Sequence, residues 1–494
     1  MSHLTLEQEL KTAGTYGHFI DGDFPIPRGE TAHVTLNPAN GTPLAHFAEA
    51  TSAEVDDAVN AARHAFLTVW GRMTGRERYE HMRRLAVELE RRTERLAWLE
   101  TLDVGKPIGV SRATMRDLPY TVDYYASVLH GLTGETLQVG EHDVLNFTLR
   151  EPLGVCALIV PWNYPLTLAL LKIAPAIAAG NTVVLKPSEV TPLSALELAR
   201  AVADAGIPAG VINVVFGGGA TGNALIHHPG IDKISFTGGT ETGKRIYAAA
   251  AAGLKRVTLE LGGKSPLVVF DDADLPRAIE VAKIDSIRNS GQVCAACTRL
   301  IVHEAVADAF VDGLTQALAG VRIGEPGNDE TEMGPVINAA QLKRISSYRE
   351  VGHEEGAHFT ECQNIDTRAD LKNGYYTAPA LFLQASNEMR VSREEIFGPV
   401  QTVLRFRTEE EGLRLANDSP YGLAACVFTR DSARAIRTAR TIQAGTVCIN
   451  YGVKAVVEAP FGGYKQSGIG KERGLQAMLD DTQLKSVRLY HGRT

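Results

Sequence analysis

Apolar residues recur at helical spacing near the start of the chain. Over Thr51–Trp70 they fall every three or four positions, and Thr51 with Glu54 has the spacing of a capping box, which satisfies free amides at a helix start. Over Arg76–Glu100, a methionine and several leucines repeat this spacing among many arginines and glutamates. The pattern therefore predicts two amphipathic helices.

The middle of the chain has a different pattern, in which short apolar runs alternate with helical segments. The runs begin after Gly154 and read GVCALIV, TVVLK, VINVV, KISFT and RVTLEL. Strands that are apolar on both faces are typical of a parallel sheet covered by helices on each side. We expect a Rossmann-type sheet here and a second α/β unit after Gly263. In residues 132–153, by contrast, apolar and polar residues alternate and turn signals interrupt the run, which predicts an antiparallel ribbon. Leu484–Leu489 is also strand-like.

Composition and charge exclude several classes of protein. With 44% hydrophobic residues, 22% charged residues and a net charge of −8, the chain is globular and lacks the basic character of a nucleic-acid binder. Six cysteines in 494 residues are too sparse for a secreted disulfide framework, so we expect reduced thiols and a cytoplasmic location. The first ten residues lack the apolar core of a secretory signal, and we expect the mature chain to begin there. No apolar stretch approaches the ~18 residues of a membrane span.

Two glycine-rich turns match nucleotide-binding motifs only in part. Gly217–Gly222 (GGGATG) has dinucleotide-fingerprint spacing, but it lies late in the sheet, whereas the fingerprint belongs to the first strand–helix turn. Gly238–Lys244 (GGTETGK) matches a phosphate-binding loop, but Arg245 stands where an NTPase needs Ser or Thr for Mg²⁺. What remains is a strand ending at Gly238 and a helix whose free amides can accept a diphosphate. We favour this second turn as the phosphate site.

Three segments carry candidate chemistry. NSGQVC ends at Cys294, LELGG contains the lone carboxylate Glu260 on an apolar strand, and PWNYP places Asn163 at the end of the first parallel strand. Taken singly, each has a structural explanation: a packed thiol, a salt-bridged glutamate or a turn asparagine. Together they supply a nucleophile, a base with a raised pKa and an amide donor for an oxyanion. Cys294 and Cys297 lack a second ligand pair at metal spacing, so no metal site is expected.

These motifs together resemble the aldehyde dehydrogenase superfamily, in its NAD(P)-dependent, hydrolytic form. The resemblance runs from GHFIDGDF and TLNPANG through PWNYP, KPSE, FTGGTETG, LELGGKSP, GQVC, MGPVI and EEIFGPV to PFGGYKQSGIGKE. It implies that Cys294 attacks an aldehyde, that the Asn163 amide and the Cys294 N–H hold the oxyanion, and that Glu260 activates the water that hydrolyses the thioester. The retained Glu260 disfavours a CoA-acylating relative, and the retained Cys294 disfavours a non-catalytic one.

The resemblance also implies a bound dinucleotide. A carboxylate at Glu189 would repel a 2′-phosphate, which favours NAD over NADP while leaving NADP possible. Many relatives carry Ser at the position of Gly239, so we expect slightly looser binding here. The implied cofactor contacts are Trp162, Lys186, Ser188, Glu189, Gly219, Phe236, Thr237, Gly238, Gly239, Thr240, Gly243, Leu261, Gly262, Glu395 and Phe397. Lys172 and Glu472 match positions proposed to relay protons, or they form a structural ion pair.

The segments implied to surround the substrate are largely apolar. Leu166–Leu171, Cys294–Thr298 and Asn450–Pro460 lack the tryptophans that cage a quaternary ammonium in betaine-aldehyde oxidisers. We therefore expect a medium hydrophobic aliphatic or aromatic aldehyde, with a semialdehyde or amino aldehyde as the alternative. No arginine pair is evident in these segments, although Lys454 weakens the case against a dicarboxylate semialdehyde.

The resemblance gives an expected fold class and domain division. The fold is α/β, with a Rossmann-type cofactor domain (1–131 and 154–261), an α/β catalytic domain (262–478) and a small β oligomerisation domain (132–153 and 479–494). The C-terminal strand would add to a neighbour's sheet and cover its edge. We expect a homodimer or homotetramer, with a small aldehyde as the substrate and neither nucleic acid nor membrane as a partner.

Overall fold

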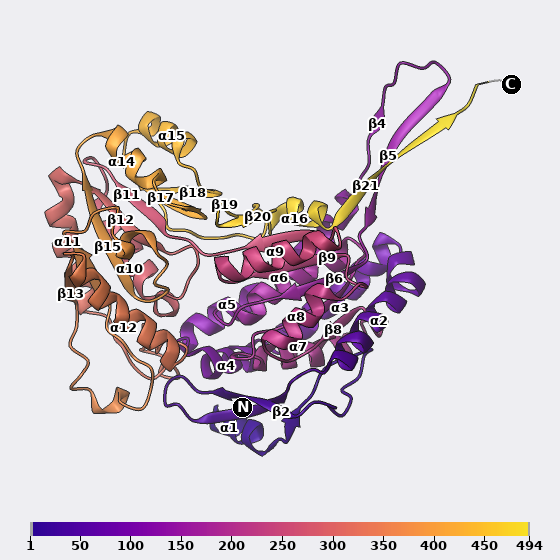
Figure 1. Ribbon diagram of the computed structural model, residues 1–494, viewed down its shortest axis with the longest axis horizontal. Coiled ribbons are helices and arrows are strands. Elements are labelled where there is room, and N and C mark those ends of the chain that lie inside the picture. The colour runs from indigo at the N-terminus through magenta and orange to yellow at the C-terminus, as the bar shows by residue number, and fades with distance from the viewer. Residues whose placement is uncertain (1–2, 493–494) are drawn as a thin grey trace.

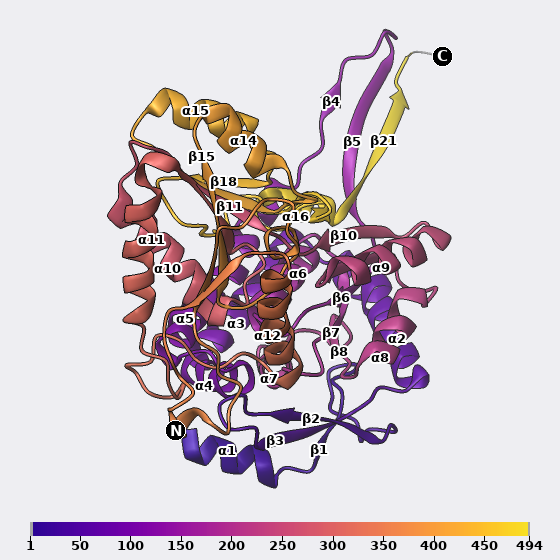
Figure 2. The ribbon, with the colours of Figure 1, turned by 60° about the vertical axis from the view of Figure 1, so that its left-hand side comes forward.

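The computed structural model describes residues 3–492. Residues 1–2 and 493–494, which belong to the predicted cofactor and oligomerisation domains, lie outside the described residues. Two helix-covered sheets form the body, and a β arm projects from it (Figures 1 and 2). No helix within residues 3–492 has the length and apolar character needed to cross a bilayer.

The first sheet has the strand order β20-β10-β9-β6-β7-β8. Its parallel strands are β6 (Val155–Ile159), β7 (Thr182–Lys186), β8 (Ile212–Val214), β9 (Lys233–Thr237) and β10 (Arg256–Glu260), and β20 (Gly468–Ile469) is antiparallel. The chain starts at the central β6 and crosses first to one side and then to the other, as in a Rossmann-type sheet. The predicted fold class is confirmed, and the switch point between β6 and β9 is where ligands bind in such sheets.

Helices cover both faces of this sheet. One face carries α2 (Ser52–Thr68), α8 (Gly219–His227) and α9 (Thr240–Ala252). The other face carries α3 (Gly75–Arg91), α4 (Thr93–Val104), α5 (Ile108–Val128), α6 (Pro165–Ala178) and α7 (Leu193–Asp204). Both bonds of the predicted capping box at Thr51 and Glu54 are present.

The prediction of a single helix over Arg76–Glu100 is wrong. The helix breaks at Arg92, where φ is −97° and ψ is 1°. The Arg92 guanidinium pairs with Glu88 one turn earlier and with Asp204 at the end of α7. These pairs hold the chain where α3 ends and α4 begins, and Asp204 lies 112 residues away in the sequence.

The second sheet has seven strands in the order β13-β14-β15-β12-β11-β17-β18. They are β11 (Ser265–Val269), β12 (Cys297–His303), β13 (His358–Glu361), β14 (Ala380–Leu383), β15 (Val400–Phe406), β17 (Ala424–Phe428) and β18 (Thr446–Ile449). The helices beside it are α10 (Leu275–Ile287), α11 (Glu304–Ala319), α12 (Ala339–Glu354), α13 (Arg390–Arg393), α14 (Glu409–Asn417) and α15 (Ser432–Thr441). The predicted second α/β unit is therefore present.

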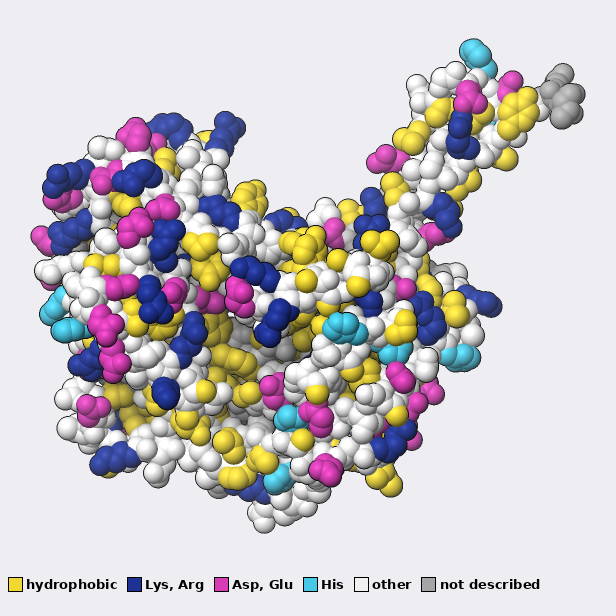
Figure 3. Space-filling view, in the orientation of Figure 1, with side chains coloured by type: hydrophobic (Ala, Val, Ile, Leu, Met, Phe, Trp, Pro, Cys, Tyr) yellow, Lys and Arg dark blue, Asp and Glu magenta, His cyan; other side chains and the backbone are white. Residues whose placement is uncertain are grey.

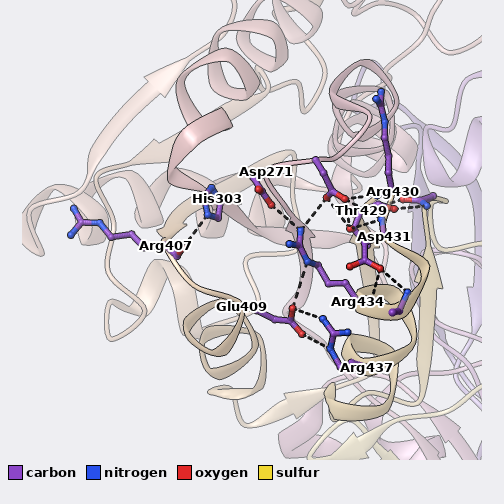
Figure 4. A network of polar contacts seen from close by, with 12 residues as sticks. Asp271, His303, Arg407, Glu409, Thr429, Arg430, Asp431, Arg434 and Arg437 are labelled. Atoms are coloured by element: carbon purple, nitrogen blue, oxygen red, sulfur yellow. Dashed lines mark hydrogen bonds and ion pairs between the residues drawn. The ribbon is translucent and has the colours of Figure 1, made fainter.

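A polar network fixes α14 and α15 to this sheet, and Figure 4 shows it from close by. The Arg434 guanidinium donates to Asp271 over 2.8 Å and approaches Glu409 at 3.5 Å. Arg437 binds the same Glu409 at 2.9 Å, and Arg434 also lies 4.8 Å above the ring of Phe270. None of these residues lines the cleft described below, so the contacts serve to hold the two helices in place.

The remaining strands form three small sheets. The N-terminal one contains β1 (Thr15–Tyr16), β2 (Thr31–Leu36) and β3 (Pro43–Ala48), preceded by α1 (His3–Thr12). Another pairs β16 (Tyr421–Gly422) with β19 (Tyr464–Lys465). The arm pairs β4 (Thr136–Leu137) and β21 (Thr482–Tyr490) with opposite edges of β5 (Val144–Pro152), and α16 (Gly474–Asp480) precedes β21. The antiparallel ribbon and the C-terminal strand that the sequence predicts are both present.

Candidate active site

A cleft of about 720 Å³ opens at the carboxyl ends of the first sheet's strands, opposite residues of the second unit. Figure 3 shows the molecule hollowed on this face. Among the residues that line it are Asn163, Cys294 and nearly all of the predicted cofactor contacts, namely Trp162, Lys186, Ser188, Glu189, Gly219, Phe236, Thr237, Gly238, Gly239, Leu261, Gly262, Glu395 and Phe397.

Five predicted site residues do not line this cleft: Thr240, Gly243, Glu260, and the pair Lys172 and Glu472 described below. Thr240 is the first residue of α9, and Gly243 lies behind Leu261, where an added Cβ would come within 2.5 Å of the Leu261 side chain. Gly243 therefore permits the helix to approach the end of β10. Glu260 ends β10, and its carboxylate lies against Gly462.

The loop before Cys294 has an unusual backbone. Asn289, Ser290 and Gly291 are all left-handed, with φ of 48°, 54° and 73°. The Ser290 hydroxyl donates to the carbonyls of Gly334 and Pro335 over 2.8 and 3.1 Å. An added Cβ at Gly291 would lie 2.2 Å from the carbonyl of Gly398, so only glycine fits there. Such strained residues persist where surrounding contacts hold them.

Asn163 is brought to this loop by the turn between β6 and α6. Its Nδ2 donates to the carbonyl of Gln292 over 3.0 Å, and Nδ2 of Asn289 donates to the Asn163 carbonyl, also over 3.0 Å. The second amide hydrogen of Asn163 has no protein partner within residues 3–492. It is available to a ligand oxygen beside Cys294.

The protonation of Cys294 and Glu260 follows from their burial. Burial raises the pKa of the Cys294 thiol to about 12, and the carboxylates of Glu395 and Glu260 add to the shift. Burial also raises the pKa of Glu260 well above its usual range, and the charge of Glu472 reinforces this. Neither carboxylate oxygen of Glu260 finds a hydrogen-bond partner in the described chain. The thiol is protonated near neutral pH, and Glu260 has the environment of a group that can take up a proton.

Helices α8 and α9 both begin at glycine turns on the cleft wall, but their N-termini differ. At α8 the carboxylate of Glu49 accepts from Gly218 N–H over 2.8 Å and from Thr221 N–H over 3.2 Å. At α9 the N-cap is Gly239, no side chain caps the helix, and a Cβ there would have open space around it. Free amides and a glycine cradle fit the diphosphate of a dinucleotide at α9.

Gln341 and Arg344 of α12 also line the cleft, and the sequence motifs do not mark them. Gln341 Nε2 donates to the Phe397 carbonyl over 2.7 Å, and Arg344 donates to the Glu395 carbonyl over 2.6 Å. Burial raises the pKa of Glu395 to about 7, against the hydrogen bond it accepts from Gly263 N–H. The α12 residues therefore hold the loop that carries two of the predicted cofactor contacts, Glu395 and Phe397.

Comparison with known proteins agrees with this geometry. The model of the aldehyde dehydrogenase family matches residues 27–487. The chain belongs to the aldehyde dehydrogenase family. Among solved structures, a Burkholderia cenocepacia protein assigned to the aldehyde dehydrogenases is 43% identical, with a TM-score of 0.94 over 97% of this chain and 98% of that one.

Two further relatives of this aldehyde dehydrogenase are solved. Betaine aldehyde dehydrogenase from Staphylococcus aureus, in complex with NAD⁺, is 37% identical with a TM-score of 0.96, and the match covers 100% of this chain and 98% of that chain. A mutant form of an aldehyde dehydrogenase from Bacillus cereus is 41% identical with a TM-score of 0.95, and the match covers 99% of both chains. The predicted family and enzyme class are confirmed.

A buried ion pair of the dehydrogenase lies close to Glu260. Lys172 and Glu472 form a buried ion pair, and Lys172 also donates to the Ser235 hydroxyl over 3.0 Å. The predicted pair is thus assembled, and both its members influence the pKa of Glu260.

Arg473 was not singled out from the sequence, although it follows Glu472 in the motif GIGKERG. Its guanidinium donates to the Ala455 carbonyl over 3.0 Å and lies 6.0 Å from the ring centroid of Phe461. Burial lowers the pKa of Arg473, whereas the charge of Glu472, and to a smaller extent those of Cys294 and Glu260, oppose this shift. A cation therefore lies within electrostatic reach of the candidate nucleophile.

Proposed function

We propose that this chain oxidises an aldehyde to a carboxylic acid with NAD, through a covalent bond to Cys294. One observation carries the proposal: Cys294 and Asn163 line the same cleft, and one hydrogen of the Asn163 amide is left for a ligand. The carboxylate of Glu260 lies close enough to affect the pKa of Cys294. A nucleophile, an oxyanion donor and a base are the three parts that this chemistry needs.

Each residue has one task in the reaction. Glu260 takes the thiol proton, directly or through water, as Cys294 Sγ bonds to the aldehyde carbon, because a thiol with a pKa of about 12 does not ionise unaided. The Asn163 amide and the Cys294 N–H hold the resulting thiohemiacetal oxyanion. NAD, when bound, supplies the acceptor for the hydride that leaves the same carbon.

The second half of the reaction releases the acid. After the proton taken from the thiol has left Glu260 for the solvent, Glu260 deprotonates a water molecule, which adds to the thioester carbon and breaks the carbon–sulfur bond. The proton returns to the Cys294 sulfur, so the enzyme ends as it began. The Lys172–Glu472 pair beside Glu260 offers a route for protons to leave this buried position, and its burial equally suits a structural ion pair.

The cofactor preference is proposed from one end of the cleft. Glu189 lines it and lies 3.3 Å from Lys186 Nζ. A carboxylate there can accept from ribose hydroxyls and repels a 2′-phosphate, which supports NAD over NADP. The uncapped α9 N-terminus is the proposed seat of the diphosphate, and Glu395 with Phe397 is the proposed seat of the nicotinamide ribose and ring.

The proposed substrate is a medium hydrophobic aliphatic or aromatic aldehyde. Leu168 lines the same cleft as Cys294, and the cation of Arg473 disfavours a positively charged substrate. The second candidate is an amino aldehyde, because the chain is similar to a betaine aldehyde dehydrogenase. A semialdehyde that carries a carboxylate is a further alternative, because the cation of Arg473 would attract its negative charge.

The test is NADH formation across aliphatic, aromatic, amino and semialdehyde substrates, beside a Cys294→Ala variant. We expect turnover in the wild type, its loss in the variant and the highest kcat/KM on an uncharged apolar aldehyde. A wild type that is silent on every aldehyde with both NAD and NADP would contradict the proposed activity. A best rate on a cationic aldehyde would move the substrate to the second candidate.

We also propose a cytoplasmic homodimer or homotetramer assembled through the arm. Six unpaired cysteines support a reducing compartment. Strand β21 leaves one edge unpaired and exposes Leu484, Leu489 and Tyr490, while β18 lies at an edge of the seven-stranded sheet. Joining such edges between subunits would cover both. Deletion of residues 482–494 should then abolish assembly in sedimentation, and an intact oligomer after deletion would refute the arrangement.

A further inference from the structure

We propose that Gln292 positions both oxyanion donors of this site: its side chain holds the Cys294 loop in place, and its backbone carbonyl orients the Asn163 amide. The inference rests on the proposed function, because it assigns Gln292 a task in that reaction. Gln292 touches no reacting atom in this arrangement, so it is a positioning residue.

The Gln292 side chain uses both ends of its amide. It is fully buried, its Nε2 donates to the Asn289 carbonyl over 2.9 Å, and its Oε1 accepts from Ile337 N–H over 2.9 Å. The first bond closes the left-handed turn on itself, and the second ties the loop to the neighbouring segment. A side chain without both a donor and an acceptor cannot make the two bonds.

The Gln292 carbonyl determines how the Asn163 amide is oriented. It accepts from Nδ2 of Asn163 over 3.0 Å and from Nδ2 of Asn289 over 3.3 Å. If the Asn163 amide were flipped, its Oδ1 would face another oxygen, which is unfavourable. The carbonyl therefore selects the orientation in which the second Nδ2 hydrogen is free for the oxyanion.

The two donors are consequently coupled through one residue. The Cys294 N–H is two residues from Gln292, and the Asn163 amide is bonded to its carbonyl, so a displacement of Gln292 would move both. Loss of one oxyanion donor costs on the order of 100-fold or more in kcat, and a misplacement of about 1 Å can cost a similar factor.

The test replaces Gln292 by a residue of similar size without hydrogen bonds. We expect Gln292→Met to lower kcat about 100-fold, as for loss of an oxyanion donor, while the KM for NAD changes by less than about twofold. In an Asn163→Ala background the same substitution should cost only about tenfold, because one of the two donors is already absent and only the Cys294 N–H is left to be displaced. Binding of NADH, followed by fluorescence, reports whether each variant is folded.

Gln401 provides a matched control. It is fully buried in β15, and its Nε2 donates to the carbonyls of Ala282 and Cys297, both over 3.0 Å. Neither acceptor lines the cleft. Gln401→Met should lower the melting temperature as Gln292→Met does but leave kcat within about twofold, because the two hydrogen bonds that it loses end on carbonyls that do not line the cleft.

The outcomes separate this inference from the proposed function. If wild type turns over aldehyde and Gln292→Met loses no more kcat than Gln401→Met, or if its loss multiplies in full with that of Asn163→Ala, the positioning role is wrong. If Gln292→Met does not fold, Gln292→Glu is measured instead, since it keeps the acceptor for Ile337 N–H and replaces only the donor. A silent wild type would overturn the proposed function first.

Discussion

Two glycine-rich turns on one wall of the cleft have similar sequences and opposite structures. GGGATG leads into α8 and GGTETG leads into α9, and each follows a strand of the same sheet. The α8 terminus is filled from within the protein, because Glu49 accepts hydrogen bonds from its amides. The α9 terminus is open to the cleft. A helix start attracts an anion in both cases, and the difference lies in whether the protein already supplies one.

The filled turn is a structural device. Burial opposes ionisation of Glu49, yet hydrogen bonds from Thr221, His33 and Gly218 lower its pKa to about 2. The carboxylate is therefore charged at neutral pH and stabilises α8 as a substrate phosphate would. GGGATG has the better match to dinucleotide spacing, so motif matching alone selects the turn that Glu49 already fills.

The largest effect should come from filling the open turn in the same way. Gly239→Asp places a carboxylate at the α9 N-terminus, where a Cβ meets no atom within 4 Å. Repulsion between unit charges ~4 Å apart is about 4 kcal/mol at an effective dielectric constant of about 20, so we expect the Kd for NAD to rise at least ~100-fold. Titration of NADH fluorescence measures this change.

The neutral variant Gly239→Asn is the control for Gly239→Asp. It has nearly the same shape, so it should weaken binding by less than about fivefold if charge is the cause, since it keeps the α9 amides and adds no repulsion. If both variants weaken NAD binding equally, the size of the side chain is the cause and its charge is not. That result would contradict the idea that a carboxylate can fill the α9 turn as Glu49 fills the α8 turn.

The next effect should come from emptying the filled turn. Glu49→Ala removes the cap of α8 and should lower the free energy of unfolding by about 1–2 kcal/mol, as for other lost helix caps. Urea denaturation followed by circular dichroism measures it. Glu49→Gln keeps an acceptor and should cost less. If Glu49→Ala instead tightened NAD binding more than about tenfold, α8 would be a phosphate site held shut by Glu49.

The features that the sequence predicted are those encoded over short stretches. The apolar strands of the first sheet, the capping box at Thr51 and the turn that presents Asn163 depend on neighbours in the chain. The filling of the α8 turn could not be predicted, because Glu49 lies 169 residues from Gly218 and carries no motif. The break at Arg92 and the contacts of Gln341 with the Phe397 loop were missed for the same reason, since their partners lie 112 and 56 residues away.

A smaller effect follows from the pKa of Glu49. Its folded pKa of about 2 lies below the ordinary value of about 4.3, so its contribution to stability is complete above ~4.3 and is lost as the pH falls toward ~2. The stability difference between wild type and Glu49→Ala should therefore stay constant from neutrality to ~4.3 and shrink as the pH falls from ~4.3 toward ~2. Urea denaturation at a series of pH values measures it. A difference that stays constant on acidification would show that the carboxylate charge does not stabilise α8.

The smallest effect distinguishes two uses of the open turn. In Gly239→Ser the backbone angles, φ −69° and ψ 143°, suit serine, and serine is a favoured N-cap. If the hydroxyl donates to the diphosphate, the Kd for NADH should fall about threefold, the equivalent of one hydrogen bond worth roughly 0.6 kcal/mol. If it instead accepts from the α9 amides, the melting temperature should rise while the Kd increases, because the cap competes with the phosphate. Fluorescence titration and thermal unfolding of the same variant decide between them, and a Kd that changes in neither direction would contradict an open turn that binds the cofactor.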